Sequence, residues 1–110
     1  MSSLFAQYKQ ERENKHVLEV ENGFATYYFP QAGTCYLEDI FVAPAARKSR
    51  LCFSMADEIV AIAKKAGCVK LLGSVCAGTH NSTVSLKVLL AYGFQLHGVE
   101  GQMIYFVKEI

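Results

Sequence analysis

The sequence predicts an α/β (α+β) fold, with one mixed, mostly antiparallel sheet and helices on both faces, in a single domain over residues 1–110. Between residues 15 and 42, short strand-like segments alternate with tight turns, which is typical of an antiparallel meander. Residues 50–66 repeat apolar side chains at helical spacing, and an apolar segment of strand length follows. Because a strand–helix–strand crossover joins parallel neighbours, the sheet is expected to be mixed.

The N-terminal half is predicted as a short helix followed by three strands. The helix is expected over residues 3–14, where apolar side chains recur on one side. The strands are expected at residues 15–20, 24–29 and 35–42. Glu21-Asn22-Gly23 is predicted to form the first tight turn with Gly23 at positive φ, and Pro30 is predicted to end the second strand.

The C-terminal half is predicted as helix, strand, helix and two closing strands. These elements are expected at residues 50–66, 68–75, 82–92, 94–97 and 103–108. Lys64 and Lys65 suit the negative end of the first helix dipole, and Gly67 suits a left-handed cap. Gly93 is expected to end the second helix.

Composition narrows the class of protein. With 52% hydrophobic and 19% charged residues, the chain is expected to fold as an ordinary globular domain. A net charge of +1 argues against a general nucleic-acid binder. No apolar run approaches the ~20 residues of a membrane span, and the start Met1-Ser2-Ser3 lacks the features of a signal peptide. We therefore expect a cytoplasmic protein that binds neither nucleic acid nor membrane.

The four cysteines are predicted to be free thiols. Cys35, Cys52, Cys68 and Cys76 lie within or beside apolar segments. Their even number leaves disulfide pairing open, but free cysteine behaves as a small core hydrophobe. None has a spacing typical of a metal site, so no metal is expected.

A basic turn between the third strand and the long helix is the strongest candidate binding site. Arg47-Lys48-Ser49-Arg50 connects these two elements. A helix N-terminus offers unpaired amide N–H groups and a partial positive charge, which suit an anionic phosphate. The sequence therefore predicts phosphate binding at this turn.

Two junctions and the order of elements resemble the GNAT superfamily of acyl-CoA-dependent N-acyltransferases. Residues 42–52 resemble the family's strand-to-helix segment, with Arg47 at the Arg or Gln that opens the pyrophosphate loop. The segment Ser82-x-x-Ser85-x-x-Val88-Leu89-x-x-Tyr92-Gly93-Phe94 resembles the family's late helix ending in Gly-Phe. The resemblance runs from about His16 to the end and implies an N-terminal region reduced by a strand and a helix. It also implies that acetyl-CoA is the acyl donor.

By this resemblance, the first junction is the main part of the acetyl-CoA site. The residues expected to hold the donor are Phe41, Val42, Arg47, Ser49, Arg50, Leu51, Cys52 and Ser82. Arg50 and Cys52 stand where the family has glycines, which let the backbone approach the pyrophosphate closely. Either the guanidinium of Arg50 compensates by pairing with a phosphate, or the ligand site has been lost.

Acetyl transfer needs a base for the attacking amine and often an acid for the leaving thiolate. Glu38 and Asp39 are candidate bases, and strand alternation predicts that they face opposite sides, unless both are only solvent-facing carboxylates. His80 is a further candidate, with a cap as its alternative role. The resembled family's tyrosine acid falls at Leu89 here, so Tyr92 is the candidate replacement, unless it only packs at the helix end.

The leading interpretation is a minimal N-acetyltransferase that transfers an acetyl group to an amine of a small molecule or a protein. Two alternatives remain: a non-catalytic scaffold that serves in interaction or ligand sensing, and a small phage-encoded protein that interacts with its host. A free edge strand favours a homodimer. Four aromatic side chains either pack across the strands or line an acceptor groove: Tyr27, Tyr28, Phe29 and Tyr36.

Overall fold

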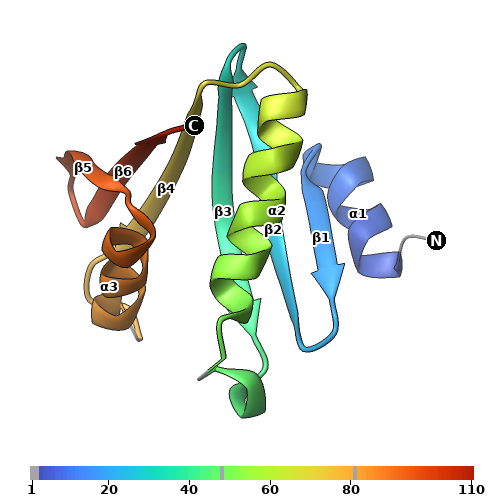
Figure 1. The fold of residues 1–110 in the computed structure, drawn as a ribbon, viewed down its shortest axis with the longest axis horizontal. Coiled ribbons are helices and arrows are strands. Elements are labelled where there is room, and N and C mark those ends of the chain that lie inside the picture. The colour runs from blue at the N-terminus through green and yellow to red at the C-terminus, as the bar shows by residue number, and fades with distance from the viewer. Residues whose placement is uncertain (1–2, 48, 81) are drawn as a thin grey trace.

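The computed structural model describes residues 3–47, 49–80 and 82–110, and only the backbone of Ser82. The strands are β1 (His16–Val20), β2 (Gly23–Gln31), β3 (Thr34–Val42), β4 (Lys70–Cys76), β5 (Gln95–Glu100) and β6 (Met103–Glu109). The helices are α1 (Leu4–Glu13), the short 3-10 helix η1 (Pro44–Ala46), α2 (Leu51–Lys65) and α3 (Ser82–Tyr92). The strands form one sheet in the order β1-β2-β3-β4-β6-β5 (Figure 1).

Helices cover both faces of this sheet, as the sequence predicts. The buried side of α2 packs on β2 and β3. Leu71 of β4 belongs to the same core, and Gly73, on the same face of that strand, packs against Leu89 of α3. On the other face, Phe5 of α1 meets Phe24 of β2 edge to face, with ring centroids 5.3 Å apart. The sheet is mixed because only β3 and β4 pair in parallel.

The helical periodicity of residues 50–66 is confirmed by the side of α2 that is buried. Its buried side chains are Met55, Ala56, Ile59 and Ala63, at spacings of three and four residues. Met55, Ile59 and Ala63 belong to one core cluster with Cys35 and Leu37 of β3 and Phe106 of β6. Gly67 caps this helix with φ +88°, which confirms the predicted left-handed residue.

All four cysteines are free thiols, as predicted. Cys35 and Cys68 are buried, and Cys52 and Cys76 are half-buried. Burial raises the pKa of Cys35 to about 12, so this thiol resists ionisation and reacts slowly. Within the described residues, no helix combines the length and the hydrophobicity that a membrane span requires.

Two predictions about the meander are wrong. The second strand does not end at Pro30 but continues to Gln31, and its pairing with β3 is irregular between Tyr28 and Gln31. The proline, which lacks an N–H, therefore falls where the hydrogen-bond ladder is already interrupted. In the first turn, the residue with positive φ is Asn22, at +72°, and Gly23 instead begins β2.

Gly23 is needed for close packing rather than for an unusual backbone angle. A Cβ atom there would lie 2.9 Å from the carbonyl oxygen of Phe41 and 3.0 Å from the terminal methyl of Met55. The backbone oxygen cannot move aside without shifting β3, the strand that carries the candidate site. The missing side chain thus lets α2 lie close to the sheet.

We predict that Gly23→Ala lowers the free energy of unfolding by about 1–3 kcal/mol, because the added methyl overpacks this contact. Gly98→Ala is the matched control, since a Cβ at Gly98 meets no atom within 4 Å. This control should change stability by less than about 0.5 kcal/mol. Urea unfolding of both variants measures the difference, and equal stabilities would contradict the packing argument.

Candidate functional site

The parallel strands β3 and β4 part after a short paired stretch. They pair only at Thr34–Lys70, Cys35–Leu71 and Tyr36–Leu72. Further along, the two strands diverge towards their C-terminal ends (Figure 1). The gap forms a groove of about 550 Å³, lined by both strand ends, the start of α2 and one side of α3. One edge of β3 there has no strand partner in the described part of the chain, so its backbone groups are available to a ligand.

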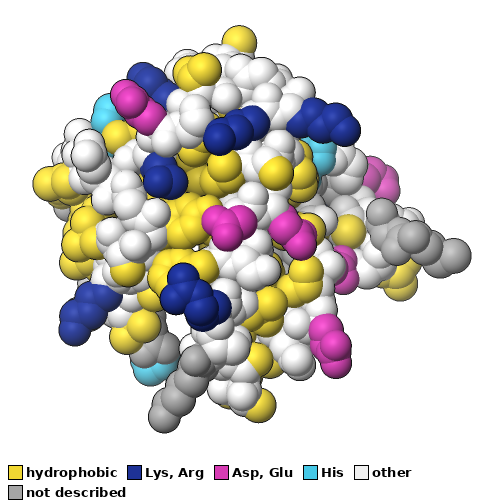
Figure 2. Space-filling model, in the orientation of Figure 1, with side chains coloured by type: hydrophobic (Ala, Val, Ile, Leu, Met, Phe, Trp, Pro, Cys, Tyr) yellow, Lys and Arg dark blue, Asp and Glu magenta, His cyan; other side chains and the backbone are white. Residues whose placement is uncertain are grey.

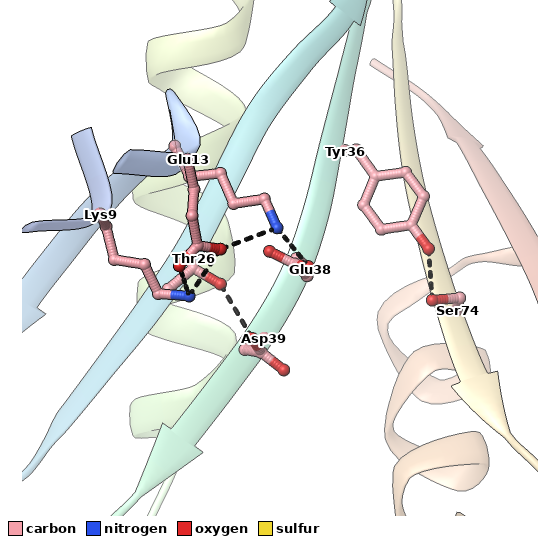
Figure 3. Close-up of polar contacts among 8 residues, drawn as sticks. Lys9, Glu13, Thr26, Tyr36, Glu38, Asp39 and Ser74 are labelled. Atoms are coloured by element: carbon pink, nitrogen blue, oxygen red, sulfur yellow. Dashed lines mark hydrogen bonds and ion pairs between the residues drawn. The ribbon is translucent and has the colours of Figure 1, made fainter. Parts of the chain in front are cut away.

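A β-bulge at Glu38 shapes one wall of this groove. Thr26 of β2 pairs with Asp39, whereas the next residue, Tyr27, pairs with Leu37, so Glu38 is the extra residue of β3. The Thr26 hydroxyl donates to Asp39 Oδ2 over 3.1 Å. Glu38 and Asp39 both lie on the sheet face turned away from α2 (Figure 3). The prediction that they face opposite sides is wrong, because the bulge interrupts the alternation.

A chain of ion pairs joins Glu38 to the end of α1. Lys15 Nζ lies 2.8 Å from Glu38 Oε1 and 3.3 Å from Glu13 Oε1, and Lys9 Nζ lies 3.1 Å from Glu13 Oε2 (Figure 3). The hydrogen bond to Glu38 raises the pKa of Lys15, and the one from Lys9 lowers the pKa of Glu13. Glu38 Oε2 is buried and has no hydrogen-bond partner among the described residues.

Sequence reasoning missed Lys15. Its contact with Glu38 spans 23 positions of the chain and depends on strand register and on the bulge. The lysine itself stands between two charged or polar neighbours at a helix end, Asn14 and His16, where a solvated side chain is the ordinary expectation. No pattern in the sequence therefore distinguished it.

A pair of hydroxyl groups bridges the two strands where they part. The Tyr36 hydroxyl donates to Ser74 Oγ, which lines the groove. The Tyr36 ring stacks on Tyr28 at 5.2 Å, and burial raises the pKa of Tyr36. Tyr27, by contrast, is buried in the core. Tyr28 and Tyr36 thus pack against each other across the strands, whereas Tyr27 belongs to the core under α2.

The basic turn brings one arginine to the groove. Arg47 lines it, donates its Nε–H to the Val42 carbonyl over 2.9 Å, and lies 5.4 Å from the centre of the Phe41 ring. Ser49 also lines the groove, and its hydroxyl accepts the Leu51 N–H over 3.2 Å at the start of α2. Lys48 lies outside the described residues. Arg47 and the start of α2 thus line the same groove.

Cys52 and Arg50, which replace the family glycines, lie in different places relative to the groove. Cys52 lines the groove, and burial raises the pKa of its thiol. Arg50 is not among the groove residues: its guanidinium lies 5.2 Å from the centre of the Phe53 ring, beside Asp57 in a shallow surface depression. Basic and acidic side chains are interspersed over the face that α2 and α3 cover (Figure 2).

The remaining predicted residues divide between the groove and the packing of α3. His80 is exposed and lines the groove, as does Leu89. Tyr92 is not a groove residue: its hydroxyl donates to Asp57 Oδ1 over 2.6 Å, and its ring stacks on Phe53 at 5.7 Å. Burial and the bond to Asp57 raise the pKa of Tyr92, so this position favours packing over proton donation. The Ser82 side chain lies outside the described residues.

Comparison with known proteins identifies the family. The model of the acetyltransferase (GNAT) family matches residues 2–94, which include α1, a helix that the resemblance noted above did not cover. The chain belongs to the GNAT family. A comparison with curated proteins gave no match.

Solved structures of this family share the fold at low sequence identity. A GNAT-family protein from Desulfovibrio desulfuricans is 20% identical with a TM-score of 0.80, over 94% of this chain and 75% of that one. The PaiA N-acetyltransferase of Thermoplasma acidophilum, in complex with coenzyme A, is 17% identical with a TM-score of 0.78, over 97% and 69%. A GNAT acetyltransferase of Elizabethkingia anophelis, with acetyl-CoA bound, is 17% identical with a TM-score of 0.75, over 100% and 84%.

We predict that the hydroxyl of Tyr92 contributes to stability through Asp57. Tyr92→Phe keeps the stacked ring and removes the hydrogen bond, so it should lower the free energy of unfolding by about 1 kcal/mol. Asp57→Ala tests the same bond from α2, because it removes the acceptor oxygen. In a double-mutant cycle followed by urea unfolding, the two losses should not add, because residues in contact couple. If the two losses of unfolding free energy simply add, the hydrogen bond between Tyr92 and Asp57 does not contribute to stability.

Proposed function

We propose that this protein transfers the acetyl group of acetyl-CoA to an amine by direct attack in a ternary complex. The observation that carries the proposal is the groove between the parted strands, because it joins a free strand edge, a helix N-terminus and a carboxylate. Further support comes from the relatives of T. acidophilum and E. anophelis, whose structures hold CoA and acetyl-CoA.

The donor would be bound at the basic turn and along the free edge of β3. Arg47 and Ser49, with the amide of Cys52 and with that of Leu51 once it leaves the Ser49 hydroxyl, would hold the pyrophosphate, since charge and helix dipole both favour an anion there. The backbone of Phe41 and Val42 would bind the acyl arm as an added strand does. Ser82, whose side chain lies outside the described residues, stays a proposed contact for the pantetheine arm or for the acceptor.

Glu38 would act as the base. It lines the groove, and one of its oxygens is buried without a partner among the described residues, so it can accept a proton from the attacking amine. A backbone N–H of β3 would stabilise the charge that develops on the thioester oxygen. His80 is the alternative base from the far wall. With Leu89 in place of a tyrosine, the thiolate would leave without a positioned tyrosine acid.

We predict that Arg47→Glu weakens acetyl-CoA binding by about tenfold or more, the equivalent of ~1.4 kcal/mol, because it reverses a charge beside the phosphate. Arg50→Glu makes the same charge change at a residue outside the groove and should have a clearly smaller effect. Titration calorimetry measures both dissociation constants. A larger loss for Arg50→Glu would move the pyrophosphate site to the outer side of α2.

For catalysis, we predict that Glu38→Gln lowers the rate of CoA release with an amine acceptor by about 10²-fold or more, since general base catalysis is typically worth that much. Asp39→Asn is the matched control, because Asp39 lies on the same face and already accepts a bond from Thr26. A thiol assay across a range of pH follows the reaction. Equal rates for wild type and Glu38→Gln would exclude this carboxylate as the base.

The non-catalytic alternative rests on two features of the groove: Leu89 on its α3 wall in place of a tyrosine, and Cys52 in place of a family glycine at the start of α2. Calorimetry and the thiol assay separate it from the enzyme. Binding of acetyl-CoA without CoA release, for a range of amines and pH values, would favour a ligand-sensing scaffold.

A further inference from the structure

Lys15 brings an amine of the chain itself to the candidate base. It lies between Asn14, which ends α1 with φ +54°, and the first residue of β1. Its Nζ is 2.8 Å from Glu38 Oε1, and its side chain is 22% exposed. A primary amine is therefore held in direct contact with a carboxylate that lines the groove.

The surroundings of this amine have the chemistry of an alkylammonium site. Lys15 Nζ lies 5.5 Å from the centre of the Tyr28 ring, whose other stacking partner is Tyr36. A carboxylate together with an aromatic face is a typical combination for binding a primary ammonium group. The side chain of Lys15 thus occupies a place that suits the amine of an acceptor.

Glu38 keeps one oxygen free while it holds this amine. Oε1 receives the hydrogen bond from Lys15, whereas Oε2 is buried and has no partner in the described part of the chain. A buried carboxylate oxygen without a partner is costly, so structures tend to retain one only where it has a use. Here the free oxygen can take up a proton while the amine stays in contact with Oε1.

We propose that Lys15 is a self-acetylation site, at which the chain transfers an acetyl group from acetyl-CoA to its own amine. This inference rests on the proposed function. The Lys15 ammonium first releases one proton to solvent. The neutral Nζ then forms a bond to the acetyl carbon and gives its second proton to Glu38, while the bond between that carbon and the sulfur of CoA breaks. The thiolate takes the proton from Glu38, so the products are N-acetyl-lysine, CoA and the released proton.

Catalysed transfer to Lys15 is distinguishable from spontaneous acetylation, because the same contacts slow the uncatalysed reaction. The hydrogen bond to Glu38 raises the pKa of Lys15, so less of the amine is free, and the side chain is mostly buried. A chemical acetyl donor should therefore favour the exposed lysines Lys64 and Lys65. Lys9 provides a matched comparison, since it is similarly buried but pairs with Glu13.

Acetylation would also change the site. It removes the charge of Lys15 and with it the ion pairs to Glu13 and Glu38. Glu38 would then face the groove without a resident cation. Self-acetylation would thus open the carboxylate to a free amine.

The test is peptide mass spectrometry of the full chain after incubation with acetyl-CoA, and separately with acetyl phosphate. With acetyl-CoA, Lys15 should be acetylated at least about tenfold faster than Lys9, Lys64 and Lys65, the scale of general base assistance. With acetyl phosphate, Lys15 should be slower than the exposed lysines. The rate constant at Lys15 should not depend on protein concentration.

Glu38→Gln should have opposite effects on Lys15 acetylation, depending on whether the transfer is catalysed or spontaneous. If the transfer is catalysed, this substitution slows acetylation of Lys15 by acetyl-CoA by about tenfold or more. If the reaction is only chemical, it frees the amine and speeds the reaction. A faster Glu38→Gln variant, a Lys15 no faster than Lys64, or a rate constant that rises with protein concentration would each overturn the proposal.

Calorimetry with acetyl-CoA, on the same preparation and on Lys15→Arg, separates this inference from the proposed function. Lys15→Arg should bind acetyl-CoA with unchanged affinity and show no preferential acetylation. Binding by the wild type without acetylation of Lys15 would overturn the inference and leave the donor site standing. No binding at all would overturn both.

Discussion

The parting of β3 from β4 is the constraint on which the rest of the site depends. The two strands share three residue pairs, and then each follows its other neighbour, β2 or β6. Gly73 lets Leu89 and Phe94 pack closely on β4, and Gly23 does the same for α2 on the first half of the sheet. Each half of the sheet therefore has its own helix packed on it, and the groove lies between the two halves.

The bulge at Glu38 adds chemistry to this architecture. One inserted residue turns two successive carboxylates to the same face of the sheet, although a regular strand would separate them. Their roles then differ by partner, because Asp39 accepts a bond from Thr26 and Glu38 meets Lys15. A backbone irregularity thus determines which acid faces an amine.

The sequence predicted the elements well because they follow from local patterns. The buried spacing of α2 came from periodicity, the bounds of α3 from an N-cap residue and Gly93, and the parallel crossover from connection rules. Prediction from the sequence failed where residues on neighbouring strands determine the local structure. The positive φ at Asn22, the strand that continues past Pro30 and the bulge all depend on register. The directions of Arg47 and Arg50 depend on which ring each one meets, Phe41 or Phe53, and no spacing along the chain encodes that choice.

The contacts between Arg47 and the end of β3 affect how the groove would bind an anion. The guanidinium is fixed by the Val42 carbonyl and by the Phe41 ring, both at the end of the strand whose free edge lines the groove. A long side chain normally loses rotamer entropy when it binds, and these two contacts favour one orientation of the Arg47 side chain before any ligand is bound. Cation and strand edge therefore form a preorganised unit, so any shift of the strand end moves the charge and the backbone donors together.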